Sequence, residues 1–437
     1  MLFIEVTHLL GYARSGKTLS GIQRLTFNAA IGLVKLLGEE NVELLAYSSW
    51  FKTYRTAPAS LLKVFAANEN PGLLQAAINS VAALARPSVR QLDPNSRAWD
   101  LAIVGKFDKV LLTESWWWRD GIIEANEGLS YPGGPTVYRF VHDVIPITAP
   151  RFVGRKFSKK FAESFMREAS SAHVLIANSN ATQSETRLVL DKNGMKQKDI
   201  VVIPLAHEFK SQPIVRPSAM RIVAGLPSRM KADQLLMKAT GVGSPEPFVL
   251  VVGTLERRKN MLRLLKVWRG LAAKHGAALP KLVFVGQWGV TGGQIWRYLR
   301  KIKYLGGRIK ILHFISDEQL RKLYQASQFT MYLSSYEGWG LPIGESLWLG
   351  KPVLASDASS IPEVGGKLVD YVDPDHNANI AKAIEKLVFD RAHHEQRKTK
   401  LSSAKLRSWD DFASGLAKVM GLAPNGKTLP HKVPKER

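Results

Sequence analysis

Cysteine is absent from this sequence of 437 residues. Disulfide bonds, a thiolate metal site and a cysteine nucleophile are therefore excluded. No apolar stretch approaches the length that crosses a bilayer. The first ten residues are apolar but carry Glu5 and His8 and lack a basic lead, so they predict a first strand rather than a signal peptide. We expect a cytoplasmic protein.

Acidic residues are scarce. The sequence has 37 Asp and Glu against 61 Lys and Arg, a net charge of +24, and residues 251–300 hold Glu256 as their only acid. Such an excess favours a polyanionic partner, although part of it can be solvated surface. An anionic membrane surface fits this charge. We expect no nucleic-acid partner, because zinc-finger spacing, an aromatic RNA-binding signature and a helix-turn-helix pattern are all missing.

Short apolar segments alternate with amphipathic stretches, which is typical of α/β domains with mainly parallel sheets. The length suits two domains. The predicted strands are 2–6, 42–47, 110–112, 137–141, 174–177, 201–203, 248–252, 282–285, 309–312, 329–333 and 352–355. We predict an N-terminal domain at 1–215, a C-terminal domain at 216–400, a closing helix within 401–422 and a disordered basic tail at 423–437.

The segment Y-E-G-W-G-L-P-I-G-E-S, residues 336–346, places Glu337 and Glu345 eight positions apart around a glycine-rich turn. It follows a predicted strand, and Pro342 suits the first turn of a helix. Glycines let a ligand approach the exposed N–H groups of the helix start. Two carboxylates beside an anion-binding helix start suit a phosphorylated sugar; two surface glutamates on an ordinary loop are the alternative.

A second group of charged residues follows the predicted strand 248–252. The sequence G-T-L-E-R-R-K-N, residues 253–260, puts three consecutive cations at a strand-to-helix junction. Arg258 can bind phosphate oxygens bidentately, and Lys259 supplies a point charge. The pair predicts a diphosphate clamp, with a solvated basic turn as the alternative.

The segment L-G-K-P-V-L-A-S-D-A-S-S-I-P-E-V-G-G, residues 349–366, completes a pattern. Together with residues 336–346 it resembles the retaining, nucleotide-sugar-dependent glycosyltransferases of family 4. The resemblance implies the GT-B fold, an α/β architecture of two Rossmann-like, doubly wound domains facing a central cleft. In that fold a C-terminal helix crosses back to the N-terminal domain, and W-D-D-F at 409–412 fits its position.

The resemblance also implies roles for individual residues. Glu345 is expected to bind the donor ribose, Glu337 to face the donor sugar, and Arg258 with Lys259 to hold the pyrophosphate. The sugar and phosphates are expected at the backbone of Gly340, Leu341, Pro342 and Ile343, and the base at the loop around Ile315. Thr254 replaces an Arg common in the family, and His313 replaces the usual Gly, so base identity stays open.

The N-terminal half carries two further elements of the resemblance. F-V-H-D-V-I-P, residues 140–146, is similar to the family's H-D-x-x-P element, so His142, with Asp143 beside it, is expected to orient or polarise the reacting sugar. S-G-I-Q-R, residues 20–24, resembles the family's T-G-I-x-R element. It places Gly21 and Arg24 on the acceptor or phosphate side, with a solvated Arg24 as the alternative.

The implied activity is transfer of a hexose, mannose favoured, from a nucleotide sugar to a glycan. G-T-L-E-x-R-K-N resembles mannosyltransferases that use GDP-mannose; UDP- and dTDP-sugars stay open. The expected acceptor is a lipid-diphosphate-linked oligosaccharide of bacterial surface-polysaccharide synthesis, used at the inner face of the cell membrane. No metal or other cofactor is expected, because the cations can neutralise the diphosphate.

Two rival functions remain. G-Y-A-R-S-G-K-T, residues 11–18, matches the phosphate-binding loop of an NTPase or kinase, although L-S-G at 19–21 interrupts the helix this loop requires. A non-catalytic nucleic-acid or membrane binder is the other. Phe157, Phe161 and Phe165 at helical spacing form either core, which we favour, or a membrane contact, and residues 116–118, W-W-W, are a second candidate contact.

Overall fold

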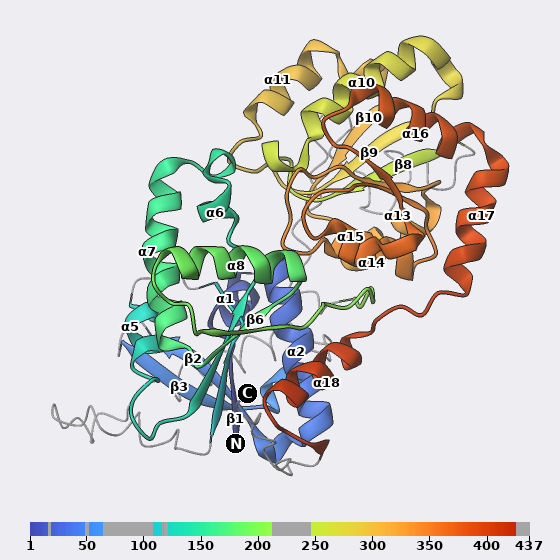
Figure 1. Cartoon of the computed structure of the whole chain (residues 1–437). Coiled ribbons are helices and arrows are strands. Elements are labelled where there is room, and N and C mark those ends of the chain that lie inside the picture. Colours follow the sequence, from blue (N-terminus) through green and yellow to red (C-terminus); the bar gives the residue numbers. More distant parts are fainter. Residues whose placement is uncertain are drawn as a thin grey trace.

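The computed structural model describes residues 1–15, 19–48, 52–63, 108–115, 117, 121–211 and 246–424. These residues form two α/β units that face each other, joined near the C-terminus by a chain that returns to the first unit (Figure 1). None of the described helices is both long and apolar enough to cross a membrane.

The N-terminal unit is built on a seven-stranded sheet in the order β3-β2-β1-β4-β5-β6-β7. Neighbouring strands are parallel except β2 and β3, which pair antiparallel at one edge. The strands are β1 (Leu2–Glu5), β2 (Val42–Ser48), β3 (Thr53–Pro58), β4 (Lys109–Leu112), β5 (Thr136–Val141), β6 (Val174–Ala177) and β7 (Asp199–Val202). The helices are α1 (Thr7–Ser15), α2 (Gly21–Leu37), α5 (Ile122–Glu127), α6 (Ile145–Thr148), α7 (Arg155–Ser171) and α8 (Asn180–Lys192).

The C-terminal unit has a fully parallel six-stranded sheet in the order β10-β9-β8-β11-β12-β13. Counted within the unit, this is the order 3-2-1-4-5-6 of a doubly wound nucleotide-binding domain. Its strands are β8 (Phe248–Val252), β9 (Lys281–Val285), β10 (Ile309–Leu312), β11 (Thr330–Tyr332), β12 (Val353–Ser356) and β13 (Asp370–Val372). Its helices are α10 (Met261–His275), α11 (Gly293–Lys301), α12 (Tyr304–Gly307), α13 (Asp317–Ala326), α14 (Leu341–Trp348), α15 (Ile361–Gly365), α16 (Asn377–Phe389) and α17 (Arg391–Ser402).

The last described helix, α18 (Trp409–Val419), lies against α2 of the N-terminal unit (Figure 1). Ser408 caps it in a capping box with Asp411, and the apolar face buries Trp409 and Phe412. The fold predicted from the sequence, with two doubly wound units and a helix crossing back, is confirmed. The predicted boundary at residue 400 falls in the last turn of α17, and the one at residue 215 lies outside the described residues.

Two strands, β3 and β13, were not predicted. β3 contains only two buried residues, Tyr54 and Ala57, because it lies at the antiparallel edge of its sheet. β13 is three residues long and contains Asp370. Neither offers the continuous apolar run by which the buried parallel strands are recognised.

The structure also separates the alternatives for two motifs. Phe161 and Phe165 are each 1% exposed, so the phenylalanine stripe of α7 is core; Phe157 packs partly buried beside them. Gly11–Ser15 of the phosphate-loop pattern is helical, as the second half of α1. A phosphate-cradling loop needs irregular backbone there, so the NTPase interpretation loses its structural basis; residues 16–18 lie outside the described residues.

The contact between α2 and α18 leaves no room at Gly32. A Cβ added there would lie 2.6 Å from the Cβ of Ala413. We expect Gly32→Ala to destabilise the N-terminal unit by about 1–3 kcal/mol through overpacking. Gly270→Ala, in α10, is the matched control because a Cβ there meets nothing within 4 Å. Thermal unfolding should show a lower midpoint for Gly32→Ala only; equal midpoints would contradict this packing.

Candidate active site

The charged residues singled out in the C-terminal unit lie where its strand order reverses. Arg258 and Lys259 sit in a 3-10 turn, Arg257–Lys259, after β8, and Glu337 follows β11, the strand beside β8. Loops that leave such a reversal point diverge to opposite faces of the sheet, which makes it the usual ligand position in doubly wound domains. The topology therefore brings together residues that are almost eighty positions apart in the chain.

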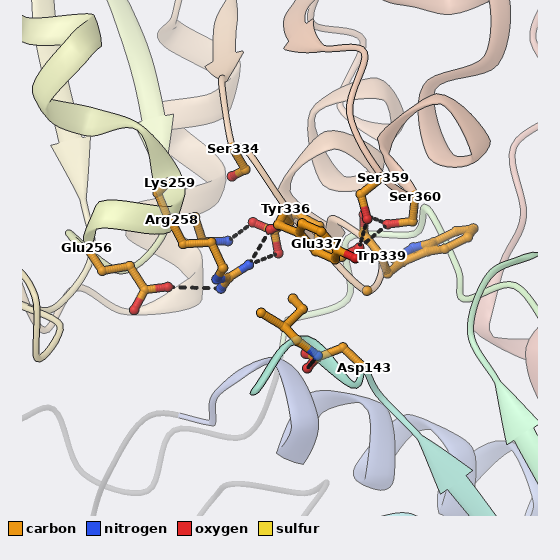
Figure 2. A network of polar contacts seen from close by, with 12 residues as sticks. Asp143, Glu256, Arg258, Lys259, Ser334, Tyr336, Glu337, Trp339, Ser359 and Ser360 are labelled. Atoms are coloured by element: carbon orange, nitrogen blue, oxygen red, sulfur yellow. Dashed lines mark hydrogen bonds and ion pairs between the residues drawn. The ribbon is translucent and has the colours of Figure 1, made fainter. Parts of the chain in front are cut away.

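Glu337 is clamped between the two cations (Figure 2). Its Oε2 lies 2.6 Å from Nη1 of Arg258, and its Oε1 lies 2.6 Å from Nζ of Lys259. Lys259 also donates to the Tyr332 hydroxyl at 2.7 Å, and Arg258 pairs with Glu256 at 2.9 Å. From the sequence, these residues are expected to have separate tasks; the structure joins them into one network and adds Glu256 and Tyr332.

Burial and charge act against each other on Glu337. Its removal from water would by itself raise the carboxyl pKa, but the adjacent Arg258 and Lys259 lower the pKa to about 2. Burial lowers the pKa of Lys259, and the carboxylate of Glu337 opposes that shift. Glu337 is therefore an anion at neutral pH and has no proton to donate.

The second predicted carboxylate, Glu345, lies one turn inside α14. It is 7% exposed and accepts a hydrogen bond of 2.9 Å from the Tyr324 hydroxyl. Nη1 of Arg24, from α2 of the N-terminal unit, lies 3.7 Å from Glu345 Oε1, and Arg24 Nη2 pairs with Asp317. Burial raises the pKa of Glu345, and Arg24 opposes this shift. Arg24, expected as an anion contact or a solvated residue, thus bridges two carboxylates across the two units.

The start of α14 faces the start of α2. Gly340, with φ +132°, precedes α14, Pro342 occupies its first turn, and Ile343 N–H donates to Gly340 O at 2.9 Å. A Cβ added to Gly21, the first residue of α2, would lie 3.6 Å from Leu341 Cδ1. This is ordinary van der Waals distance, so Gly21 lies beside the start of α14. The predicted residues 340–343, 345, 21 and 24 converge at this point.

His142 and Asp143 follow β5 and approach the network from the N-terminal unit. His142 Nε2 lies 2.7 Å from Thr113 O, so this nitrogen carries the proton and Nδ1 is an acceptor. Burial lowers the pKa of His142 to about 4, so the ring is neutral at neutral pH. Asp143 lies below the Arg258–Glu337 pair in Figure 2 and accepts from Ile145 N–H at 3.1 Å. Burial raises its pKa, and the charge of Arg258 lowers it.

Hydrogen bonds across the two units hold the glutamate loop against the His142 loop. Ser179 Oγ and Thr182 Oγ1 donate to Gly338 O at 2.9 and 3.3 Å. Asn178 Nδ2 donates to His142 O at 2.7 Å. The loop between β6 and α8 thus contacts both candidate catalytic loops, a link that no local sequence pattern indicated.

Glu363 makes a second connection between the units. Its carboxylate accepts from the backbone N–H groups of Asn180 and Ala181 at 2.7 and 2.8 Å. An anion is favoured there because the first N–H groups of a helix lack partners within it. This residue belongs to the S-S-I-P-E motif, whose neighbours Ser359 and Ser360 donate to Glu337 O at 2.7 and 2.9 Å.

The expected base-binding loop differs from the rest of the site. Ile315 is 7% exposed and packs in the core, whereas Phe314 is 45% exposed with φ +55°. His313 is 3% exposed and its Nδ1 contacts Gly286 O. Because this imidazole is accommodated inside, the substitution of the usual Gly leaves the loop's outer surface free.

No group of three or more His, Cys, Asp or Glu side chains in the described residues has the geometry to hold a metal ion. The positive charges nearest Glu337 are the side chains of Arg258 and Lys259.

Comparison with known proteins defines the class. Residues 233–403, which contain both glutamates and both cations, match the family model "Glycosyl transferases group 1". O-antigen chain mannosyltransferase B of Escherichia coli is 33% identical over 165 residues, 38% of this chain and 43% of that protein. Serotype-specific mannosyltransferase WbdA of Escherichia coli is 26% identical over 247 residues, 56% of this chain and 29% of that protein. The matches thus span less than half the length of these relatives.

Solved structures share the fold over the whole chain. Anabaena HepE, in complex with UDP and glucose, has a TM-score of 0.59 at 16% identity, with 96% of this chain and 98% of that chain covered. Sucrose-phosphate synthase of Thermosynechococcus elongatus has a TM-score of 0.55 at 15% identity, covering 96% and 97%. The protein therefore has the GT-B fold. Residues 233–403 are similar to the group 1 glycosyltransferases, and parts of the sequence are similar to mannosyltransferases.

The low pKa of Glu337 predicts a pH dependence of stability. A carboxyl whose pKa falls from 4.5 to about 2 on folding stabilises the folded state above pH 4.5 and loses this contribution as pH falls toward 2. The full contribution is on the order of 3 kcal/mol. The stability difference between wild type and Glu337→Gln should therefore be constant above pH 4.5 and shrink below it in thermal unfolding. Glu318→Gln, at an exposed position, is the control; a pH-independent difference would refute the ion-pair account.

Gly338 tests the contact between the units. A Cβ at this residue would lie 2.0 Å from His142 O, a backbone atom that cannot move alone. We expect Gly338→Ala to separate the units and speed amide exchange at Asn180 and Ala181, whose N–H groups Glu363 holds. Gly293→Ala, where a Cβ meets nothing within 4 Å, should leave that exchange unchanged. Unaltered protection in Gly338→Ala would show that the two loops do not touch in solution.

Proposed function

We propose that this protein is a retaining glycosyltransferase that moves a hexose, mannose favoured, from a nucleotide sugar to a lipid-diphosphate-linked oligosaccharide. Its place is the synthesis of a bacterial surface polysaccharide at the cytoplasmic face of the membrane. The observation that carries the proposal is the buried Arg258–Glu337–Lys259 network opposite the His142 loop. Fixed cations, a fixed anion and a neutral imidazole meet there at the reversal point of a nucleotide-binding sheet.

The cations account for departure of the nucleotide. As the bond between the sugar C1 and the diphosphate oxygen breaks, negative charge grows on that oxygen. Arg258 and Lys259 are held by their carboxylate partners, so they stabilise this charge without first reorganising. Each preorganised donor of this kind is typically worth about 10²–10³-fold in rate.

Glu337 and His142 act on the sugar. An ionised carboxylate accepts hydrogen bonds from sugar hydroxyls and stabilises positive charge that develops on the ring. His142, neutral and donating through Nε2 to Thr113 O, offers Nδ1 as an acceptor for a hydroxyl. It orients the sugar rather than supplying a proton.

In this scheme the anomeric configuration of the sugar is retained without a protein nucleophile. The acceptor oxygen bonds to C1 on the face that the diphosphate leaves, and the departing phosphate oxygen takes the acceptor's hydroxyl proton. Atoms and charge balance with the nucleoside diphosphate and the glycan as the only products. The cations neutralise the diphosphate in this scheme, so we expect activity without added metal.

The remaining site residues bind the donor. Glu345 accepts from the ribose hydroxyls, the amides at the start of α14 hold the phosphates and sugar, and the backbone around Ile315 borders the base. Similarity to two mannosyltransferases, together with G-T-L-E-R-R-K-N, supports GDP-mannose as the donor. Similarity to O-antigen and serotype-specific enzymes supports a surface polysaccharide as the product.

A thermal-shift panel tests the donor site. The unfolding midpoints of wild type and of Glu345→Ala are measured with each of five ligands: GDP-mannose, UDP-glucose, UDP-N-acetylglucosamine, dTDP-rhamnose and ATP. We expect GDP-mannose to raise the unfolding midpoint of wild type and to lose this effect in Glu345→Ala, because the ribose loses its carboxylate acceptor. Lys17→Ala should respond as wild type does. A shift with ATP alone that Lys17→Ala abolishes would refute the proposal and revive the NTPase.

A transfer assay tests the chemistry. With a donor that shifts the midpoint, Glu337→Gln and Lys259→Met should lower kcat by about 10²-fold or more while the fold is kept. NMR of the product should show the anomeric configuration of the donor. Inverted configuration, or full activity in both variants, would contradict the mechanism.

A further inference from the structure

The helix α11 presents an exposed surface of cations and apolar side chains that the active site does not use. We define the α11 face as Val290, Trp296, Arg297, Arg300, Lys301 and Lys303. Val290 is 102% exposed and Trp296 40%, whereas Ile295 and Leu299 on the opposite side of the helix are buried. The face is therefore held rigidly by its own core anchors and is open to solvent.

Charge on this face is of one sign. Residues 257–316, which include all of α11 and its flanking turns, contain 14 Lys and Arg and no Asp or Glu. Within the described part of the chain, the four cations of the face make no ion pair with a carboxylate. Arg300 instead lies over the Trp296 ring, 4.9 Å from its centroid. Cations that lack a carboxylate partner and are held on a rigid helix are available to bind an external anion.

We propose that the α11 face is a docking surface for an anionic lipid bilayer. A tryptophan beside cations matches the boundary of a membrane, where the ring lies among headgroups and the cations contact lipid phosphates. Val290 adds apolar area that has no use in contact with a nucleic-acid backbone. Arg300 covers one face of the indole, which removes it as a platform for base stacking. The surface is a convex helix rather than a groove that follows a strand.

The other candidate membrane contacts are weaker. Phe161 and Phe165 of α7 are core, and Trp117 is half-buried against Phe161, with ring centroids 5.0 Å apart. Trp116 and Trp118 lie outside the described residues. In Figure 1, α11 lies at the upper left of the C-terminal unit, on the same side of the molecule as α7. Docking there holds this side of the C-terminal unit near the headgroups.

The inference deepens the proposed function and rests on it for its purpose, because a lipid-linked acceptor presents its diphosphate at the membrane surface. Binding itself needs neither donor nor acceptor. The surface contains none of the residues assigned to catalysis or donor binding, so loss of docking and loss of chemistry are separable.

The test uses the full chain and co-sedimentation with vesicles. One set contains phosphatidylglycerol in phosphatidylcholine, and the other phosphatidylcholine alone. Wild type should bind only the anionic vesicles, more weakly as salt is raised. The triple variant R297E/R300E/K301E should lose on the order of a hundredfold in partition, from the cost of reversing each cation at a charged surface. Equal binding of wild type and variant, or equal binding to both vesicle types, would overturn the proposal.

A matched control separates this face from general charge. K382E/K386E/K400E changes the net charge equally, at exposed positions of α16 and α17 on the far side of the C-terminal unit in Figure 1. It should bind anionic vesicles within a few-fold of wild type. A loss as large as that of the α11 variant would mean that net charge alone drives binding, which would overturn the assignment to α11.

Three further comparisons complete the test. The double variant Val290→Ser/Trp296→Ser keeps every charge. We expect it to lose the part of vesicle binding that persists at high salt. Unchanged binding would refute the insertion of this face into the bilayer.

Binding to duplex DNA that exceeds vesicle binding and disappears in R297E/R300E/K301E would overturn the choice of a membrane. Transfer to a soluble acceptor fragment should persist in R297E/R300E/K301E. If wild type showed no transfer with any donor, the proposed function would fail while the vesicle result stood by itself.

Discussion

The site depends on one buried ion triplet, Glu337 between Arg258 and Lys259. Removing these charges from water costs several kcal/mol each, and only close, well-aligned partners offset that cost. Contacts of 2.6 Å on both carboxylate oxygens provide this alignment. The loop after β11 is therefore tied to the turn after β8, and the loops from the N-terminal unit close against a surface that is already in place.

The same triplet sets the chemistry available to the site. Together with Glu256, the two cations and Glu337 sum to no net charge, so the site is stable without a ligand. Under the proposed function, an arriving diphosphate would add negative charge beside cations whose positions are already determined. The two cations therefore lose little side-chain freedom when the diphosphate binds. This preorganisation favours a faster chemical step rather than only tighter binding of the ligand.

The sequence predicted the two sheets well, because strands buried on both faces read as short apolar runs. β3 and β13 were not predicted, because an edge strand and a three-residue strand lack such runs. The candidate site residues were predicted one at a time from local motifs. Their pairing was not, because Lys259 and Glu337 are 78 positions apart and only the strand order makes them neighbours. No local sequence pattern marks Asp317, Tyr324 or Ser179. Only the folded chain shows that Asp317 contacts Arg24, that Tyr324 contacts Glu345, and that Ser179 contacts Gly338.

The absence of space between Gly338 and His142 has a kinetic consequence. Under the proposed function, a sugar nucleotide that reaches the surfaces between these two backbones requires the two units to open and then reclose. The contacts that resist opening include hydrogen bonds such as the one from Ser179, each contributing about 0.5–1.5 kcal/mol net. They also include the Arg24 bridge and apolar side chains of both units in one core cluster. Opening and reclosing of two such units are hinge motions of the microsecond-to-millisecond scale. Under the proposed function, this motion sets an upper limit on turnover.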